Sequence, residues 1–304
     1  MVRTWPRKIP RICSRVLLYI LMIALSVLFI YPFLYMLITS LKSNEDLYSS
    51  TVVWIPRTLY YQNYEMAVKI TNYFQYAANS LLVTLPATLG QLISCSMVGY
   101  GLARFRFPGR GILTVLAVLA MLVPAHTIIV SQYLMYSNLG WINTYLPFIV
   151  PSFLGYGFKG ALFIFIFRQF YSGLPKELEE AARVDGCGFL RTFFKIIFPV
   201  SRSSYLVVTV LAFVWHWTNY YEPSMYISKT EKSLVASGLQ NLSYTLSLPL
   251  DVMESTLGVD STHVLNQAVL MAACFLVVLP LLLMFIILQR KFIQGIEHTG
   301  LTGE

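Results

Sequence analysis

The chain has 304 residues, of which 57% are hydrophobic and only 12% are charged, and its mean hydropathy is +0.64. A soluble protein of this length needs a larger charged surface, so this composition excludes one and indicates a protein embedded in a membrane. The formal charge of +8 and the pI near 9.3 fit contact with anionic lipid. They do not indicate nucleic-acid binding, because the chain has no basic soluble domain.

Apolar segments long enough to cross a bilayer recur along the chain, each near or above the roughly 20 residues that a spanning helix needs. They predict an all-α membrane protein with about six transmembrane helices, forming a single domain over residues 16–289. The basic residues 1–15 precede the first segment, which should be retained because no small-residue cleavage site ends it. The expected spans are residues 16–40, 77–103, 112–133, 146–167, 203–227 and 266–288.

Basic residues concentrate in alternate connecting segments, and short basic segments stay on the cytoplasmic side of a membrane. We therefore expect a multi-pass protein of the cell membrane with both termini in the cytoplasm, the second terminus being the tail of residues 290–304. The inner segments then hold Arg3, Arg7, Lys8, Arg11, Arg15, Arg104, Arg106, Arg110, Arg168, Lys176, Arg183, Arg191, Lys195, Arg202, Arg290 and Lys291. The outer segments hold only Lys42, Arg57, Lys69, Lys229 and Lys232.

Two of the expected outer segments are long enough to have structure of their own. Residues 42–76 contain Trp54-Ile55-Pro56 and a cluster of tyrosines, which suits a short ordered loop with aromatic residues at the interface. Residues 228–265 form the longest outer segment and join the last two spans. That segment carries the acidic residues Glu231, Asp251, Glu254 and Asp260.

Lys159 lies within the fourth expected span, where an ionisable residue usually faces protein or a watery cavity. Two interpretations remain open. In the first, Lys159 lines a pathway and hydrogen-bonds substrate hydroxyls or attracts an anionic substrate. In the second, it snorkels to the interface or pairs with a neighbouring helix.

The run from Trp215 to Pro223, near the end of the fifth span, combines aromatic, amide and carboxylate side chains. This combination is typical of sugar sites, so Trp217, Asn219 and Tyr220 join Lys159 as candidate residues of a substrate path. Aromatic residues also gather at bilayer boundaries for amphipathic reasons alone, and that simpler explanation is favoured. For His216 in the same run, we favour a hydrogen bond between packed helices.

A polar segment, residues 175–199, interrupts the apolar pattern between the fourth and fifth spans. Pro175 suits the first turn of a helix, and the acidic residues that follow favour the positive end of its dipole. Glu179 and Arg183 can pair one turn apart. Ala181 and Ala182 leave a smooth surface, and Gly186 can adopt the left-handed conformation that ends a helix.

A second short helix should follow Gly186 at once. Phe189, Phe193, Phe194 and Ile197 recur at helical spacing, which makes one face apolar. Pro199 then permits a change of direction into the fifth span. The segment therefore predicts a helical hairpin lying across the membrane surface.

The run Glu180-Ala181-Ala182-Arg183-Val184-Asp185-Gly186, followed by Phe193 and Pro199, resembles the EAA signature of permease subunits of ATP-binding-cassette (ABC) importers. The resemblance covers about residues 15–300. Over this range the sequence is most similar to the second permease of carbohydrate importers, the subfamily that includes the maltose transporter. Further residues that carry it are Pro32, Gly99-Tyr100-Gly101-Leu102-Ala103, Trp217-Thr218-Asn219 and Gln289-Arg290-Lys291-Phe292.

The resemblance implies a type I importer permease with a coupling hairpin that docks on an ATPase. Its docking residues would be Glu180, Ala181, Ala182, Asp185, Gly186, Phe193 and Pro199. It also implies four kinds of partner: a second permease, an ATPase dimer, an extracellular solute-binding protein and the bilayer. The cargo would be an oligosaccharide or a related carbohydrate. Within the outer loop of residues 228–265, the part from Ser247 to His263 is longer than usual for the family. The tail after Gln289 resembles the segment that contacts the ATPases in the maltose-type permease, but residues 297–304 depart from the usual ending.

No phosphate-binding G-x-x-x-x-G-K-[ST] loop occurs, so we expect no cofactor in this chain, with ATP and Mg²⁺ used by a separate ATPase. Cys13, Cys95, Cys187 and Cys274 form no C-x-x-C pair, and the four histidines form no H-x-x-x-H pair. Neither a disulfide framework nor a metal site is therefore indicated. We also find no G-x-S-x-G or H-E-x-x-H motif, and we expect a transport subunit rather than an enzyme.

Two other classes remain as alternatives. An ion-coupled secondary transporter would carry inverted repeats with broken helices, which the sequence does not display. An intramembrane enzyme would need catalytic groups at one depth, with His126 or His216 essential to turnover. Within the importer interpretation, a non-sugar solute such as a polyol phosphate also remains open.

Overall fold

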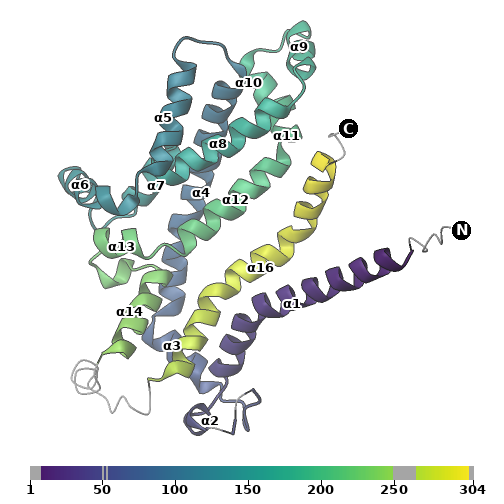
Figure 1. Ribbon diagram of the computed structural model, residues 1–304. Coiled ribbons are helices and arrows are strands. Elements are labelled where there is room, and N and C mark those ends of the chain that lie inside the picture. Colours follow the sequence, from purple (N-terminus) through teal and green to yellow (C-terminus); the bar gives the residue numbers. More distant parts are fainter. Residues whose placement is uncertain (1–7, 50, 53, 249–264, 301–304) are drawn as a thin grey trace, which may run out of the picture. The chain divides into compact units, whose positions relative to one another are not determined.

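All the regular secondary structure in the described part of the chain is helical, which confirms the predicted all-α class (Figure 1). The computed structural model describes residues 8–49, 51–52, 54–248 and 265–300. The helices are α1 (Lys8–Ser40), α2 (Asn44–Tyr48), α3 (Gln62–Ile70), α4 (Tyr73–Arg104), α5 (Arg110–Leu122), α6 (Ala125–Asn138), α7 (Leu146–Phe153), α8 (Gly157–Gly173), α9 (Glu177–Val184), α10 (Phe189–Thr192), the π-helix η1 (Phe193–Ile197), α11 (Phe198–Val200), α12 (Arg202–Trp217), α13 (Tyr221–Tyr226), the 3₁₀-helix η2 (Thr230–Lys232), α14 (Val235–Ser247) and α16 (Gln267–Gly300).

The chain divides into two compact units, and each is described by itself. The first comprises Met1–Ile70 and Leu242–Leu276, and the second comprises Thr71–Asn241 and Val277–Glu304.

In the first unit, side chains from α3 complete the end of α1. The Asn63 side-chain amide donates to the carbonyls of Ser40, at 2.9 Å, and Lys42, at 2.8 Å. Carbonyls at a helix C-terminus have no partner within the helix, so this amide satisfies groups that would otherwise be buried unpaired. The hydroxyls of Ser40 and Tyr64 lie 2.7 Å apart. The described residues of the expected outer loop, 42–49, 51–52 and 54–76, therefore include the short helices α2 and α3.

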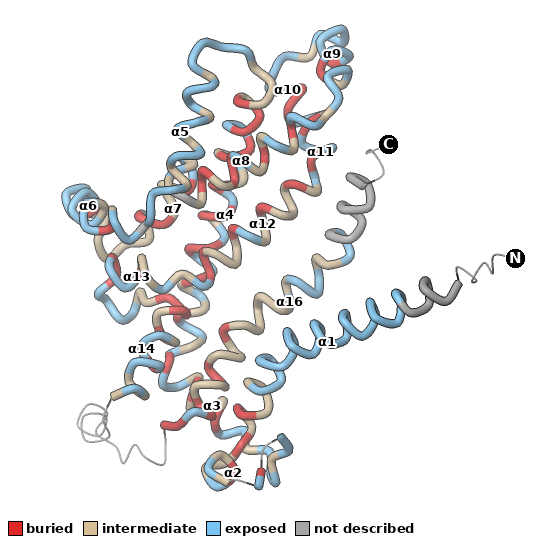
Figure 2. The backbone as a smooth tube through the Cα atoms, in the orientation of Figure 1, coloured by how far each residue is buried: buried red, intermediate tan, exposed pale blue. Residues whose placement is uncertain are grey.

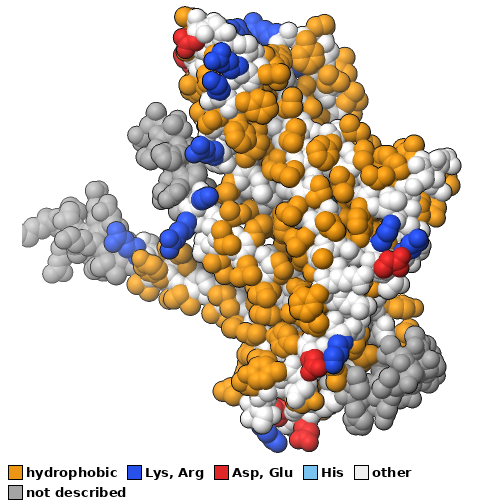
Figure 3. All heavy atoms as spheres, turned by 180° about the vertical axis from the view of Figure 1, so that it is seen from behind, with side chains coloured by type: hydrophobic (Ala, Val, Ile, Leu, Met, Phe, Trp, Pro, Cys, Tyr) orange, Lys and Arg blue, Asp and Glu red, His pale blue; other side chains and the backbone are white. Residues whose placement is uncertain are grey.

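The first predicted span is a single continuous helix, and it is exposed along most of its described length (Figure 2). Every residue from 14 to 35 is exposed, and most are large and apolar. Such a surface is unfavourable in water and suits hydrocarbon. Hydrophobic side chains also cover most of the face drawn in Figure 3. The protein therefore presents its apolar surface to lipid or to another apolar chain.

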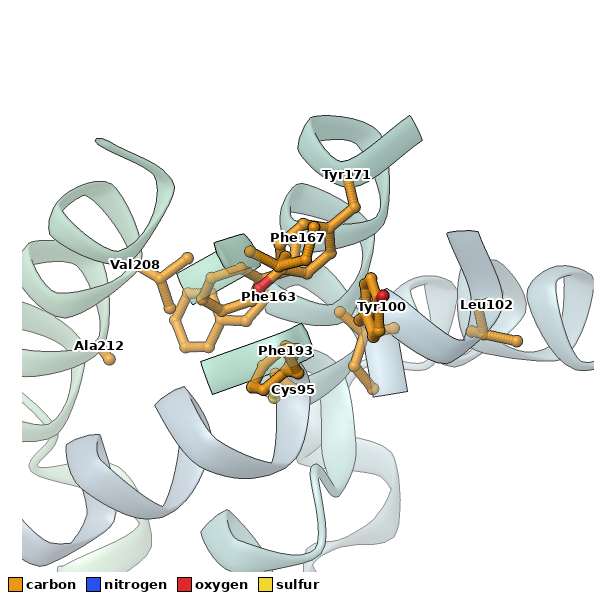
Figure 4. Close-up of a cluster of buried hydrophobic side chains, with 11 residues drawn as sticks. Cys95, Tyr100, Leu102, Phe163, Phe167, Tyr171, Phe193, Val208 and Ala212 are labelled. Carbon is orange, nitrogen blue, oxygen red and sulfur yellow. The ribbon is translucent and has the colours of Figure 1, made fainter. Parts of the chain in front are cut away.

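The second unit is built around α4, which packs closely against α8. At Gly99 an added Cβ would lie 2.8 Å from the Phe167 Cβ and 3.0 Å from the Ile164 carbonyl oxygen, so only glycine allows the two helices to approach this closely. The core beside this contact contains Phe163, Phe167 and Tyr171 from α8, together with Val208 and Ala212 from α12 (Figure 4).

Three of the predicted spans are each divided between two helices, a feature that the sequence analysis did not detect. Residues 112–133 fall in α5 and α6, which are bent by 102° at Pro124. Residues 146–167 fall in α7 and α8, which are separated by residues 154–156; φ is positive at Gly155 and at Gly157, the first residue of α8. Residues 203–227 fall in α12 and α13. The apolar composition continues across these breaks, which is why a hydropathy pattern does not register them.

By length and composition, three of the described helices are able to cross a membrane, and up to five spans result if each bent pair counts as one. The three are residues 14–40 of α1, the whole of α4, and residues 267–291 of α16. The total of about six therefore stays a prediction.

Substituting Gly99 with alanine should push α4 away from α8 and lower the thermal unfolding midpoint of the purified protein. We expect a cost of about 1–3 kcal/mol, the usual effect of overfilling a packed contact. Gly101 is the matched control, because it lies on the same helix and its added Cβ meets nothing closer than 3.8 Å. Gly101→Ala should leave the midpoint unchanged or raise it, and equal midpoints for the two variants would contradict the close-packing role of Gly99.

Candidate functional site

The segment predicted to form the hairpin folds into short helices, and Gly186 lies in the turn between α9 and α10. Helix α9 ends at Val184 with Asp185 as its C-cap residue, and Gly186 adopts a φ of +72°. The Gly186 N–H donates to the Arg183 carbonyl at 3.0 Å, and the Cys187 N–H donates to the Ala182 carbonyl at 2.9 Å. These two bonds form the Schellman motif, in which a left-handed residue satisfies the last carbonyls of a helix. The predicted left-handed conformation of Gly186 at the end of the helix is therefore confirmed.

Helix α9 has one buried and one exposed face, and this separates the predicted docking residues. Glu180 and Ala181 are exposed. Ala182 is only 1% exposed, so the prediction that it offers a surface to a partner is wrong. Glu179 and Ala182 lie three residues apart and therefore face the same way, towards the core. Val184, which the sequence analysis passed over, is 88% exposed and extends the outer surface.

The second half of the hairpin runs through α10, η1 and α11. Arg191 and Lys195 are exposed, as predicted. Phe193 is 3% exposed and belongs to the core of α8 and α12, so it anchors the hairpin instead of contacting a partner. Pro199 is half-buried in α11, next to the 80° bend that leads into α12. The burial of Phe193 therefore corrects its predicted docking role, while the role of Pro199 stays a prediction.

Glu179 does not pair with Arg183, as the sequence had suggested, but with the end of α4. The Arg104 Nε lies 3.2 Å from the Glu179 Oε1, and the Tyr100 hydroxyl donates to the same oxygen at 3.0 Å. The Arg104 Nη2 donates to the Leu174 carbonyl at 2.6 Å. Arg183 lies one turn from Glu179 on the same helix, but Glu179 points inward and contacts side chains of α4 instead.

A pocket of about 920 Å³ opens in the second unit, away from the hairpin. Its walls come from α4, from the α5–α6 bend, from the break between α7 and α8, and from α12 and α13. The breaks in the predicted spans therefore help to create the pocket, because a straight helix would leave no concave wall there. Its polar and aromatic lining includes Gln91, His126, Gln132, Tyr136, Ser152, Tyr156, Lys159, Trp215, His216, Asn219, Tyr221, Glu222 and Tyr226.

Lys159 lines this pocket and also pairs with a residue of another helix, so it has a feature of each of the two interpretations left open by the sequence. Its Nζ lies 3.4 Å from the Glu222 Oε2. The Asn219 side-chain amide donates to the same oxygen at 2.6 Å. Lys159 and Glu222 balance each other, and they are the only Lys, Arg, Asp or Glu residues among the described residues of the lining.

The remaining candidates of the run from Trp215 to Pro223 divide between core and pocket. His216 is 6% exposed and lies 3.1 Å from the Gln91 Oε1, which confirms the predicted hydrogen bond between helices. Trp217 is 1% exposed, and its indole N–H donates to the Val277 carbonyl at 2.9 Å, so it packs in the core. Tyr220 lies outside the pocket lining. Only Asn219 and Lys159 of the four predicted path residues therefore face this pocket.

Parts of two predicted segments lie outside the described residues. In the outer loop of residues 228–265, the structure describes η2 and α14 but not residues 249–264, which include Asp251, Glu254 and Asp260. In the tail of residues 290–304, α16 continues to Gly300, and residues 301–304 lie outside the description.

Apolar helices, a polar hairpin at one end and a polar pocket among broken helices define a helical membrane transport component. Residues 95–298 match the family described as the binding-protein-dependent transport system inner membrane component. The match covers more than half of the chain, which therefore belongs to this family.

Curated relatives and a solved structure agree with this assignment. The chain is 27% identical over 292 residues to the arabinooligosaccharides transport system permease protein AraQ of Bacillus subtilis (strain 168), covering 95% of this chain and 96% of AraQ. It is 28% identical over 275 residues to the diacetylchitobiose uptake system permease protein DasC of Streptomyces coelicolor, covering 90% of this chain and 92% of DasC. A chain in the crystal structure of a bacterial ABC transporter involved in the import of the acidic polysaccharide alginate shares the fold, with a TM-score of 0.77 at 19% identity, covering 96% of this chain and 100% of that one.

Replacing Gly186 with valine should strain the turn of the hairpin and lower the thermal unfolding midpoint. A β-branched residue resists a positive φ, and we expect a cost of about 1–3 kcal/mol. Gly188 is the control in the same turn, because its φ is −69° and its added Cβ would meet nothing within 4 Å. Gly188→Val should stay within about 0.5 kcal/mol of the wild type. A similar loss for both variants would show that the left-handed turn is not the cause.

Proposed function

We propose that this chain is the permease subunit of an ATP-driven importer, in which it forms a solute pathway together with a second permease. The hairpin is the observation that carries the proposal. It presents Glu180, Ala181 and Val184 outward from a fixed turn, on a chain that otherwise exposes mainly apolar surface. A chain without a phosphate-binding loop needs an external source of energy, and a rigid polar projection is a suitable surface on which an ATPase can act.

The distribution of charge supports a cytoplasmic position for this hairpin. It lies in one of the basic segments that favour the inner side of a membrane, where ATP is available. The chain would then be a non-catalytic subunit, with ATP and Mg²⁺ bound by two partner ATPase subunits. An extracellular solute-binding protein would deliver the cargo on the opposite side.

The proposed cycle follows from this arrangement. Closure of the ATPase dimer on ATP moves the hairpin, and the hairpin transmits the movement to the helices on which it is anchored. Phe193 supports this step, because it connects the hairpin to the core of α8 and α12. The pocket then opens outward, and hydrolysis returns it to the inward-facing state. The outward-facing and inward-facing states are each populated when a ligand or partner binds that state more tightly than the other.

The pocket supports a carbohydrate cargo without a net charge. Its aromatic rings can stack on the C–H faces of a sugar, and its amides can bond the hydroxyls. Lys159 is already paired with Glu222, so it offers little net attraction to an anion. We therefore favour an uncharged oligosaccharide over a polyol phosphate. The oligosaccharides named for the relatives belong to this class.

Purification of the chain from its native membrane under mild conditions should recover a second permease and an ATPase. Glu180→Lys should lose the ATPase, because it reverses the charge at the exposed centre of the proposed docking surface. The Glu65→Lys variant makes the same change on α3, far along the chain from the hairpin, and should retain every partner. Mass spectrometry of the co-purified proteins provides the measurement.

Two results would count against the assignment. Recovery of the wild-type chain alone, or as a homo-oligomer, would favour an ion-coupled transporter. Full retention of the ATPase by Glu180→Lys at equal membrane abundance would remove Glu180 from the docking surface.

Uptake of labelled arabinotriose, diacetylchitobiose and maltotriose by whole cells tests the cargo. Asn219→Leu should lower uptake of the accumulated sugar roughly tenfold, since losing a polar partner in a buried site costs about 1–3 kcal/mol. Tyr220→Leu is the control, because Tyr220 is adjacent but lies outside the pocket lining. Accumulation of none of the three sugars, or equal losses in both variants, would contradict the proposed sugar path.

A further inference from the structure

A charged cluster joins the end of α4 to the hairpin, and no part of the proposed docking surface requires it. It consists of Tyr100 and Arg104 on α4 and Glu179 on α9, and we call it the α4–hairpin cluster. The side chains of Arg104 and Glu179 are 5% and 11% exposed, and the Arg104 Nε lies 3.2 Å from the Glu179 Oε1. The contact is an ion pair without hydrogen-bond geometry at that nitrogen. The Tyr100 hydroxyl donates to the same oxygen at 3.0 Å.

The cluster holds the hairpin at three places. Through its carboxylate contact, Arg104 reaches α9, and through its Nη2 it reaches the backbone carbonyls of Leu174 and Pro175, at 2.6 and 3.3 Å. Those carbonyls belong to the segment that connects α8 to α9. The Tyr100 ring also stacks on Phe189 of α10, with centroids 5.4 Å apart. Both helices of the hairpin and its entry segment are therefore fixed to one turn of α4.

Such a cluster is better suited to fixing position than to adding stability. Removing two charges from water costs nearly as much as their attraction returns, so a buried ion pair is weak evidence for a gain in stability. Loss of a single partner is different, because it leaves an uncompensated buried charge. The hairpin therefore has a strong preference for the one placement in which Arg104 meets Glu179.

The same helix also reaches the pocket. Gln91 lines the pocket and bonds to His216, and it lies 13 residues before Arg104 on α4. At 1.5 Å per residue, this spacing is about 20 Å along the helix axis. A helix fixed at one end to the hairpin therefore contributes a polar side chain to the pocket at a point further along.

We propose that the α4–hairpin cluster makes α4 move with the hairpin, so that α4 carries the ATP-driven movement to the pocket. Arg104, Glu179 and Tyr100 are then positioning residues. The proposal rests on the proposed function, since it assumes that an ATPase moves the hairpin. It adds a second route, through α4, to the anchoring of the hairpin on α8 and α12.

The test follows the accessibility of the pocket in the whole complex, without knowledge of the cargo. Tyr156 lines the pocket and is 48% exposed, so Tyr156→Cys in a background lacking the four native cysteines provides a reporter. The complex with its co-purifying partners is reconstituted in vesicles. The rate of labelling by a membrane-impermeant maleimide is then measured with ATP plus vanadate and without nucleotide, and the ratio of the two rates is the readout.

Arg104→Gln and Glu179→Gln should each bring this ratio closer to one. The difference between the ratio and one should be at least about fivefold smaller than in the wild type, which is the lower end of typical coupling between sites. The double variant should recover most of it, because both buried charges are gone. The amide nitrogen introduced at position 104 lies where the Arg104 Nε lay, so it can donate to the amide oxygen introduced at position 179, which can still accept from Tyr100. The controls are Arg106→Gln and Glu177→Gln, the same substitutions at exposed positions two residues away, and they should keep the wild-type ratio.

The outcomes distinguish a failure of the proposed function from a failure of the role proposed for the α4–hairpin cluster. If the wild-type ratio is one, no ATP-driven change reaches the pocket, and the proposed function fails. If the wild type responds and the single variants respond equally, the role of the cluster is refuted. The same conclusion follows if the variants only lower the yield of the complex, or if the double variant loses as much as the two singles combined. Should a single variant give no complex, Tyr100→Phe and the double variant decide by the same ratio.

Discussion

The close approach of α4 and α8 at Gly99 is the contact on which the second unit depends. An added methyl group there would collide with Phe167 and with the backbone of α8, so the two helices can meet only because this residue has no side chain. The contact aligns the next residue, Tyr100, with the aromatic core and with the hairpin. The contact of the Tyr100 hydroxyl with Glu179 therefore depends on this approach.

The two faces of helix α9 in the hairpin have different surroundings. On α9, alternate faces of a short helix separate an exposed set from a buried set, and adjacent residues such as Ala181 and Ala182 belong to different sets. The exposed face is free to meet a partner, while the buried face fixes the hairpin on α4, α8 and α12. The proposed coupling role requires both properties, because a docking surface on a loosely held loop would move without displacing the rest of the chain.

The pocket depends on irregular backbone. Straight apolar helices would close against one another, whereas the bend at Pro124 and the left-handed glycines between α7 and α8 leave a concave wall. Into that wall the chain places one balanced ion pair, Lys159 with Glu222, and several amides. Non-helical backbone at membrane depth is tolerated where it lines such a cavity, because its polar groups then find partners other than lipid. The breaks and the polar lining therefore occur at the same place, because unsatisfied backbone groups and polar side chains are both costly in lipid.

The sequence by itself determined the helical class, the membrane environment and the turn at Gly186. Each of these follows from a local or compositional property: the length and composition of the apolar segments, or the freedom of a glycine at positive φ. The tertiary structure alone decided which residues face inward. Three residues that the sequence suggested for the surface or the pathway are buried: Ala182, Phe193 and Trp217. Glu179 pairs with Arg104, 75 residues away in the sequence, and not with Arg183 one turn away. The orientation of a helix about its own axis depends on what packs against it, and a partner distant in the sequence leaves no local signal.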